Sequence, residues 1–456
     1  NLPDPTILLP NKHFDTLLYT GDNSDGRNIT GLNFAPDWLW IKNRSQGDYH
    51  LLQDAVRGAT KSLYSNVYDG ENTSLANGHV NSFSSNGFQI DNGDGGNVNA
   101  NGENYVAWNW DAGETDGKTY TVTVVSDSGN KYRFDGFGTS AVTLDLAEGG
   151  TYIFNYPSAH PLKFSTTADG THGGGSEYTT GVTHNTSTQV TIVVAASAPT
   201  LYYYCGSHSG MGGQVNTNST LGSSNFDGTI QVKLKANPSA GFSIGTYSGN
   251  GSAGATIGHG LGVKPDAIII KRKDNIDNWM VYHNRTNGGV NPEQYYFELQ
   301  TTGAQINDSR MMNNTAPTSS VNSLRADNST NGGSASYLAL WFSEVSSFSK
   351  YGSYVGNGNS NGTFVFLGFR PAWVMIKRTD TTSNWNIRDT ARDPFNTTGQ
   401  YLNPNLSGAE ATSSSGIDLL SNGFKHYNTS AAFNASGGTF IYFAFAEAPF
   451  RNARAR

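Results

Sequence analysis

One sequence pattern occurs three times along the chain, and it constrains the fold more than any other feature. Each copy has a proline followed six positions later by a lysine, with mainly apolar residues between them. This spacing fits a buried β-strand that is entered through a proline turn. Three copies indicate three related structural modules. The copies span residues 36–42, 265–271 and 371–377.

Further matches extend each copy to a unit of nearly 100 residues. Residues 385–389 with Arg392 parallel residues 50–54 with Arg57, and each unit ends in an aromatic strand-like run. Short apolar runs separated by Asn, Gly and Ser turns are typical of β-sandwiches and jelly rolls. We expect Trp385 to pack in a core rather than stack on sugars. The repeated lysines are interpreted as solvated strand ends; they are Lys42, Lys271 and Lys377.

The repeats divide the 456-residue chain into four parts. Three β-sandwich modules are expected at residues 1–114, 237–346 and 347–456. Residues 117–236 lack the repeated pattern and are expected to form a separate domain between the first two modules. The predicted fold class is all-β, with jelly-roll-like sandwiches and one further Greek-key β-sandwich.

Composition excludes several classes of protein. Charged residues make up 14% of the chain, against about 25% in an ordinary globular protein, which argues against coiled coils. The net charge of −7 gives no positive field for a phosphate backbone, so nucleic acid is not an expected partner. No apolar run approaches the length of a membrane span. A single cysteine excludes an internal disulfide, so stability must come from sheet packing and subunit association.

The only cysteine belongs to a metal-ligand pattern, Cys205-x2-His208-x2-Met211, and His160 lies 45 residues upstream between two strand-like runs. A type 1 copper site uses one thiolate, two imidazoles and a weak axial thioether. Here the sequence resembles the cupredoxins, the plastocyanin and amicyanin class, over roughly 110 residues. The resemblance implies copper, with His160, Cys205, His208 and Met211 as ligands. Zinc, or a domain without metal, remains an alternative, and Pro161 departs from the usual electron-transfer pattern.

A second candidate cation loop lies at residues 91–103, where Asp, Asn and Gly residues cluster. Hard cations such as calcium prefer several oxygen ligands. The cluster does not fit the register of an EF-hand loop, and such clusters are commonly turns. We therefore leave it out of the predicted metal ligands.

The repeated modules resemble a recurrent module of marine bacteriophage structural proteins, notably in residues 434–439 and 444–450. Residues 160–165 and 201–205 resemble domains of cyanophage virion proteins. The resemblance implies a virion location, with tail, fibre and capsid-surface roles all found in such proteins. It supplies no catalytic residues, and spacing identifies no nucleophile with a base, so an enzyme is not expected.

We therefore predict a virion structural protein, part of a tail fibre or surface appendage that takes part in host attachment. Its expected partners are other virion proteins, copies of itself that cover strand edges, and a host surface glycan or protein. Nucleic acid and membrane are not expected partners. Capsid decoration is one alternative, and a copper-binding electron-transfer protein anchored by the sandwich modules is another. A secreted bacterial adhesin is a third.

Overall fold

The protein is all-β, as the sequence predicts. The structure is a computed structural model that describes residues 5–93, 96–113 and 116–449. Within these residues, no helix is long and apolar enough to cross a membrane. In this part of the chain, helical structure is confined to short turns: α1 (Asn328–Asn331), η1 (Pro10–Lys12), η2 (Gly170–Gly173), η3 (Thr286–Gly289) and η4 (Pro292–Gln294).

Module one consists of two antiparallel sheets. One sheet has the strand order β1-β8-β3-β4-β5 and the other has the order β2-β7-β6. The strands are β1 (Phe14–Thr20), β2 (Arg27–Thr30), β3 (Trp38–Asn43), β4 (Leu51–Asp54), β5 (Leu63–Tyr64), β6 (His79–Ser84), β7 (Gly87–Asp91) and β8 (Asn104–Trp110).

Module two repeats this plan with a larger first sheet. That sheet has the order β18-β19-β20-β27-β22-β23-β24-β25, and it faces the pair β21-β26. It begins near residue 223, upstream of the boundary at 237 that the repeats suggest, because β18 pairs with β19 and β19 pairs with β20. The strands are β18 (Ser223–Asn225), β19 (Val232–Asn237), β20 (Phe242–Ser248), β21 (Ala255–Gly258), β22 (Ala267–Arg272), β23 (Trp279–His283), β24 (Tyr295–Glu298), β25 (Ile306–Asn307), β26 (Val321–Leu324) and β27 (Ser336–Phe342).

Module three has two four-stranded sheets, with the orders β28-β35-β30-β31 and β29-β34-β33-β32. Its strands are β28 (Ser349–Val355), β29 (Phe364–Phe366), β30 (Phe369–Arg378), β31 (Asn386–Asp389), β32 (Thr398–Tyr401), β33 (Ala411–Leu420), β34 (Gly423–His426) and β35 (Thr439–Pro449).

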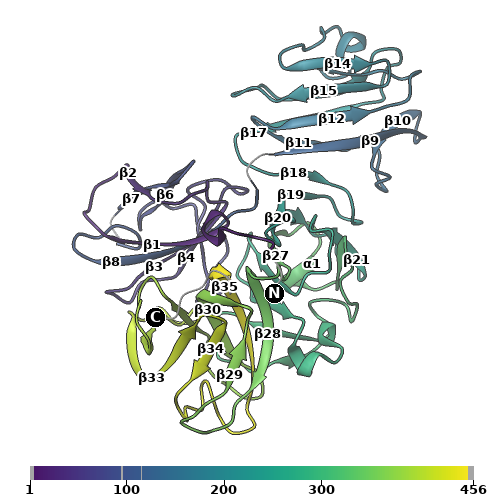
Figure 1. Cartoon of the computed structure of the whole chain (residues 1–456). Helices are drawn as coiled ribbons and strands as arrows, with labels where there is room; N and C mark the ends of the chain where they lie inside the picture. The colour runs from purple at the N-terminus through teal and green to yellow at the C-terminus, as the bar shows by residue number, and fades with distance from the viewer. Residues whose placement is uncertain (1–4, 94–95, 114–115, 450–456) are drawn as a thin grey trace.

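The inserted domain stands apart from the three modules, at the upper right of Figure 1. Its two sheets have the orders β10-β9-β12-β15-β14 and β11-β17-β16-β13, and they enclose a hydrophobic core of their own. The strands are β9 (Gly117–Ser126), β10 (Asn130–Phe134), β11 (Leu144–Ala147), β12 (Thr151–Asn155), β13 (Leu162–Ser165), β14 (Val182–Thr186), β15 (Gln189–Val193), β16 (Leu201–Cys205) and β17 (Gly213–Asn218).

The repeat is reproduced down to single hydrogen bonds. In module three the buried Asn434 accepts a bond from the Asn357 backbone N–H at 3.0 Å. Its amide donates to the Asn357 side chain at 2.9 Å and to the Asn359 carbonyl at 3.0 Å. One side chain thereby holds the loop that follows the first strand of the module. The same three bonds join Asn331 to Asn250 and Ser252, and Asn99 to Asp22 and Ser24.

The three modules close into a ring around one hydrophobic core. Strands such as β8 and β27 are buried on both faces, because one face fills the module and the other fills the centre of the ring. This explains why their sequences are continuously apolar. Aromatic rings meet across all three module boundaries: Trp38 with Phe242, Trp110 with Trp373, and Phe342 with Phe445.

Equivalent backbone hydrogen bonds join each module to the next. The residue two positions after each repeated lysine accepts a bond from the neighbouring module through its carbonyl oxygen. Glu71 donates to Lys273, Gln305 donates to Thr379, and Glu410 donates to Arg44, at 2.6, 3.0 and 2.8 Å. The three boundaries are therefore built alike, as in a cyclic trimer made from one chain.

The prediction of solvated lysines at the ends of these strands is wrong. Lys42, Lys271 and Lys377 are all fully buried. Lys271 donates to the carbonyl of Tyr68 in module one at 2.7 Å, and Lys377 donates to that of Thr302 in module two at 3.0 Å. Burial lowers the pKa of all three lysines to about 8. The carbonyls of Tyr68 and Thr302 come from distant parts of the chain, whereas Lys42 donates to the nearby carbonyls of Asn43 and Gln46. The apolar pattern of the strands indicates neither kind of contact.

Candidate metal centre

The inserted domain brings His160, Cys205 and His208 together. Cys205 is the last residue of β16 and pairs with Leu162 of the neighbouring strand β13. His160 therefore lies next to Cys205, although 45 residues separate them in the sequence. His208 follows Cys205 by three residues in the loop to β17. One ligand atom from each residue lies within 4.8 Å of the other two.

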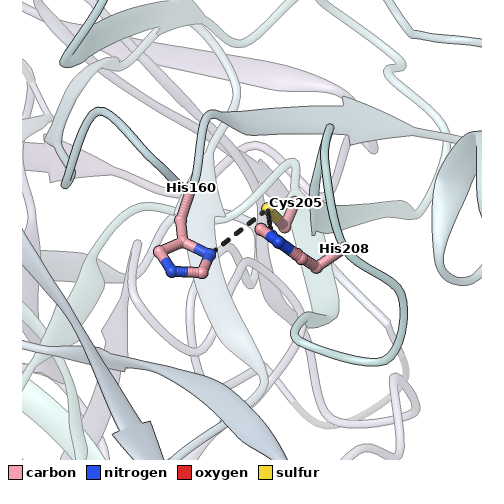
Figure 2. Close-up of side chains that lie close together, drawn as sticks. All are labelled: His160, Cys205 and His208. Carbon is pink, nitrogen blue, oxygen red and sulfur yellow. Dashed lines mark hydrogen bonds between the residues drawn. The ribbon is translucent and has the colours of Figure 1, made fainter.

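The imidazole nitrogens face the cysteine sulfur. Cys205 Sγ lies 3.8 Å from His160 Nδ1 and 3.6 Å from His208 Nδ1 (Figure 2). A metal about 2.3 Å from sulfur and about 2.0–2.1 Å from nitrogen, with an angle of about 110–120° between them, requires a separation of about 3.6–3.8 Å. The donor atoms are therefore already spaced for one metal ion.

The centre is buried on one side and open on the other. Cys205 and Met211 are fully buried in the core of the inserted domain, His160 is half-buried and His208 is exposed. All four predicted ligands thus lie at one end of one sandwich. A buried methionine in the loop that carries His208, together with an exposed imidazole, is consistent with the ligand set of a type 1 copper site.

Two neighbouring groups hold the ligand loops in place. Tyr132 donates its hydroxyl to the His160 carbonyl at 2.8 Å, and its backbone N–H donates to the Met211 carbonyl at 3.0 Å. Burial and the nearby Cys205 sulfur raise the pKa of the Tyr132 hydroxyl. A side chain at Gly212 would collide with the Tyr203 carbonyl, so glycine lets the loop turn back sharply after Met211. Sequence spacing gives no signal for Tyr132, because it lies on β10, outside the two segments that carry the predicted ligands.

The centre lies at the end of the inserted domain that faces away from the modules. At the junction, Tyr120 donates to the Ser224 carbonyl at 2.8 Å. Gly117, the first residue of β9, pairs with Thr151 in the parallel strand β12. Because both strands run away from the junction, the loop after β12, which carries His160, lies at the far end.

The other sequence candidates lie outside this centre. Within the described residues, His160, Cys205 and His208 are the one such group of metal-binding side chains. The candidate calcium loop includes Asp94 and Gly95, which lie outside those residues. Trp385 is fully buried and donates to the Glu298 carbonyl of module two at 3.4 Å, which confirms the prediction of core packing.

Comparison with known proteins identifies one family. A family model described as a domain of unknown function, DUF7483, matches residues 9–155 and 215–449. This is most of the chain, and the chain therefore belongs to that family. Nothing matches it among the curated proteins or the solved structures that were compared. The family match leaves out residues 156–214, which contain all four predicted metal ligands.

Proposed function

For a member of this family, we propose a structural role in a bacteriophage particle. The protein is part of a tail fibre or another surface appendage and contributes to host attachment. The observation that carries the proposal is the closed ring of three modules with a single core. Such a ring presents its loops and the inserted domain in fixed positions. The likeness of the repeats to phage structural modules supports the same role.

One buried ion pair of the ring links module three to module one. Arg392 is fully buried, pairs with Asp389 at 2.5 Å and also reaches Glu410 at 2.9 Å. Asp389 in turn accepts a bond from Trp108 of module one at 3.1 Å. The buried ion pair is thus saturated by contacts within and between modules, which favours a structural role over catalysis.

We propose that the inserted domain holds a copper ion through His160, Cys205, His208 and Met211. The sulfur-to-nitrogen distances and the mixed soft donor set support this assignment. A bound copper ion would supply one-electron redox chemistry. The chain itself contributes a buried thiol, an exposed imidazole edge at His208, and the Tyr132 bonds that orient the loops. Electron transfer is therefore the second candidate function, with the ring as its anchor.

Purified phage particles test the structural proposal. We expect mass spectrometry to find the protein in particles after density-gradient purification, and antibody labelling in the electron microscope to place it on a tail appendage. Labelling over the capsid surface instead would favour capsid decoration. Absence from particles, together with secretion from the cell, would overturn the proposal in favour of an adhesin.

Metal titration of the purified full chain tests the copper proposal. With Cu(II) we expect one equivalent to bind and to give an intense visible band from thiolate-to-copper charge transfer. The Cys205→Ser variant should lose the band, and Met211→Leu should retain it with a shifted energy. A colourless one-to-one zinc complex without a stable copper complex would contradict the assignment to copper.

A further inference from the structure

In module two, one extended segment, residues 229–237, covers the side of the sandwich between β20 of the first sheet and β21 of the second. Strand β19 pairs with residues 242–247 of β20 in the first sheet. Just upstream, Ile230 forms a parallel bridge with Ile257 of β21 in the second sheet, and its N–H donates to the Thr256 carbonyl at 3.0 Å. Residues 229–237 thus join both sheet edges.

This segment also completes the interior of module two. Its alternate residues Ile230, Val232 and Leu234 are 6%, 0% and 7% exposed, and they belong to the core between the two sheets. A side chain at Gly245 of β20 would collide with Val232, so the glycine leaves room for the incoming strand. The segment therefore acts as a strand supplied to the module from outside its own repeat.

The same side of module three is an open groove of about 400 Å³. Its walls are β28 and β29, each of which is the outermost strand of its sheet in the described residues. The lining residues 350–354 correspond in the repeat to residues 243–247 of β20. The lining residues 364–366 correspond to residues 256–258 of β21. The residues that bound the groove in module three are thus the counterparts of the residues that contact segment 229–237 in module two.

The groove displays apolar side chains that the other modules lack. Phe364 and Phe366 are 43% and 54% exposed, and Lys350 reaches across from β28 to lie 5.6 Å from the Phe366 ring centre. The corresponding outward residues are polar or small in the other modules: Asn28 and Thr30 in module one, and Thr256 and Gly258 in module two. An edge strand with exposed aromatic side chains is suited to pairing with another chain.

The floor of the groove differs from that of module two. The Tyr442 ring covers Gly352, so a side chain added at Gly352 would meet the Tyr442 hydroxyl at 2.2 Å. In module two the corresponding residue is Ala339, which leaves the space for Val232 and Leu234. A strand bound in module three therefore lies farther from the β28 backbone at Gly352 than β19 lies from β20 at Gly245. It packs against the Tyr442 ring and the two exposed phenylalanines.

We propose that this groove binds an extended β-strand of another protein chain. The strand pairs with the free edge of β28, as β19 pairs with β20, and packs alternate apolar side chains against Tyr442 and Phe366. Arg285, Lys350 and Glu344 line one end of the groove and leave a net positive charge there. An acidic residue in the bound strand suits that end. The inference goes beyond the proposed structural role, because it names the kind of partner and where it docks.

The test uses the full chain and a labelled synthetic peptide in which valine alternates with threonine and one end carries glutamate, the chemistry that the proposed occupant requires. We expect saturable binding by fluorescence anisotropy, and slower hydrogen exchange at residues 350–354 and 364–366. The F364N/F366T variant, which carries the residues of module one, should bind at least about tenfold more weakly. The matched control is Phe395→Thr, which removes a 74% exposed phenylalanine outside the groove and should bind as the wild type does.

Four outcomes would overturn the proposal. They are the absence of saturable binding, equal binding of a scrambled peptide, equal affinity of F364N/F366T, and protection that appears at residues 242–248 instead, which would indicate exchange with β19. Binding of an oligosaccharide that F364N/F366T abolishes, without peptide binding, would reassign the groove to a glycan. Concentration-dependent dimers that F364N/F366T abolishes, without peptide binding, would reassign the groove to an interface between two copies of the chain.

Discussion

The ring of modules and the inserted domain are both β-sandwich structures, but they use polar residues in opposite ways. In the ring, lysines, an arginine–aspartate pair and asparagines are buried and hold loops or neighbouring modules together. In the inserted domain, the sulfur and imidazole groups gather at one free end. The same architecture thus supports a rigid assembly in one region and a candidate ligand centre in the other.

Unfolding of the ring and of the inserted domain can be measured separately, because all eight tryptophans lie in the ring. They are at positions 38, 40, 108, 110, 279, 341, 373 and 385. Tryptophan fluorescence therefore reports unfolding of the ring alone. A metal-dependent signal at Cys205 reports the inserted domain. Four predictions follow from this separation, from the largest expected effect to the smallest.

Removing one partner of the buried ion pair should destabilise the ring most. Arg392→Ala leaves Asp389 buried without its cation, which should lower the free energy of unfolding by about 3–5 kcal/mol. Urea titration followed by tryptophan fluorescence measures the loss. The control is Arg310→Ala, whose side chain is 39% exposed and which should cost less than about 1 kcal/mol. Equal losses for the two variants would contradict the structural role of the pair.

Acid should weaken the ring through His283. Burial lowers the pKa of His283 to about 3, from an ordinary value of about 6.5. Above pH 6.5 its contribution to stability is complete. Below that, the unfolded chain binds a proton that the folded chain does not, so the free energy of unfolding falls by about 1.4 kcal/mol per pH unit until about pH 3.

The His283→Gln variant isolates this effect. Between pH 6.5 and pH 4 it should lose about 3 kcal/mol less stability than the wild type, whatever its stability at neutral pH. Urea titrations at a series of pH values provide the comparison. An unchanged pH dependence would show that folding does not lower the pKa of His283. The histidine would then take up a proton in the folded chain while keeping its contact with the Tyr442 carbonyl, 3.2 Å away in module three.

The asparagine that holds the loop of each module should contribute a smaller amount. Asn331→Ala removes the bonds that the buried Asn331 side chain makes to the backbone of Asn250 and Ser252, which should cost about 1–3 kcal/mol. The exposed Asn81→Ala should change stability by less than about 0.5 kcal/mol. If the repeat is energetically symmetric, Asn434→Ala should match Asn331→Ala in the same fluorescence assay, and a large difference would show that the modules are stabilised unequally.

Cys205→Ser should have the smallest effect on the ring. The substitution removes the thiolate from the candidate centre but touches no module, so tryptophan-detected unfolding should change by less than about 0.5 kcal/mol. Copper should raise the unfolding temperature of the inserted domain in the wild type and not in the variant. A parallel loss in the ring would show that the two regions unfold together.

Much of the candidate site could be predicted from sequence because its ligands are chemically distinctive. A cysteine, two histidines and a methionine at fixed spacings indicate a soft metal whatever surrounds them, and the pairing of β13 with β16 brings His160 to Cys205. The support from Tyr132 could not be predicted, because a tyrosine on a strand looks like any core residue. The strand-binding groove was also missed, because exposed Phe364 and Phe366 are indistinguishable in sequence from buried aromatic residues.

By itself, the sequence determined the all-β class, the three related modules and the separate inserted segment, because these depend on local periodicity and on internal similarity. Only the tertiary structure decided that the modules close into a ring, that Lys42, Lys271 and Lys377 are buried, and that β18 and β19 belong to module two. Burial depends on which distant loop covers a residue, and such contacts leave no periodic trace in the residues that make them.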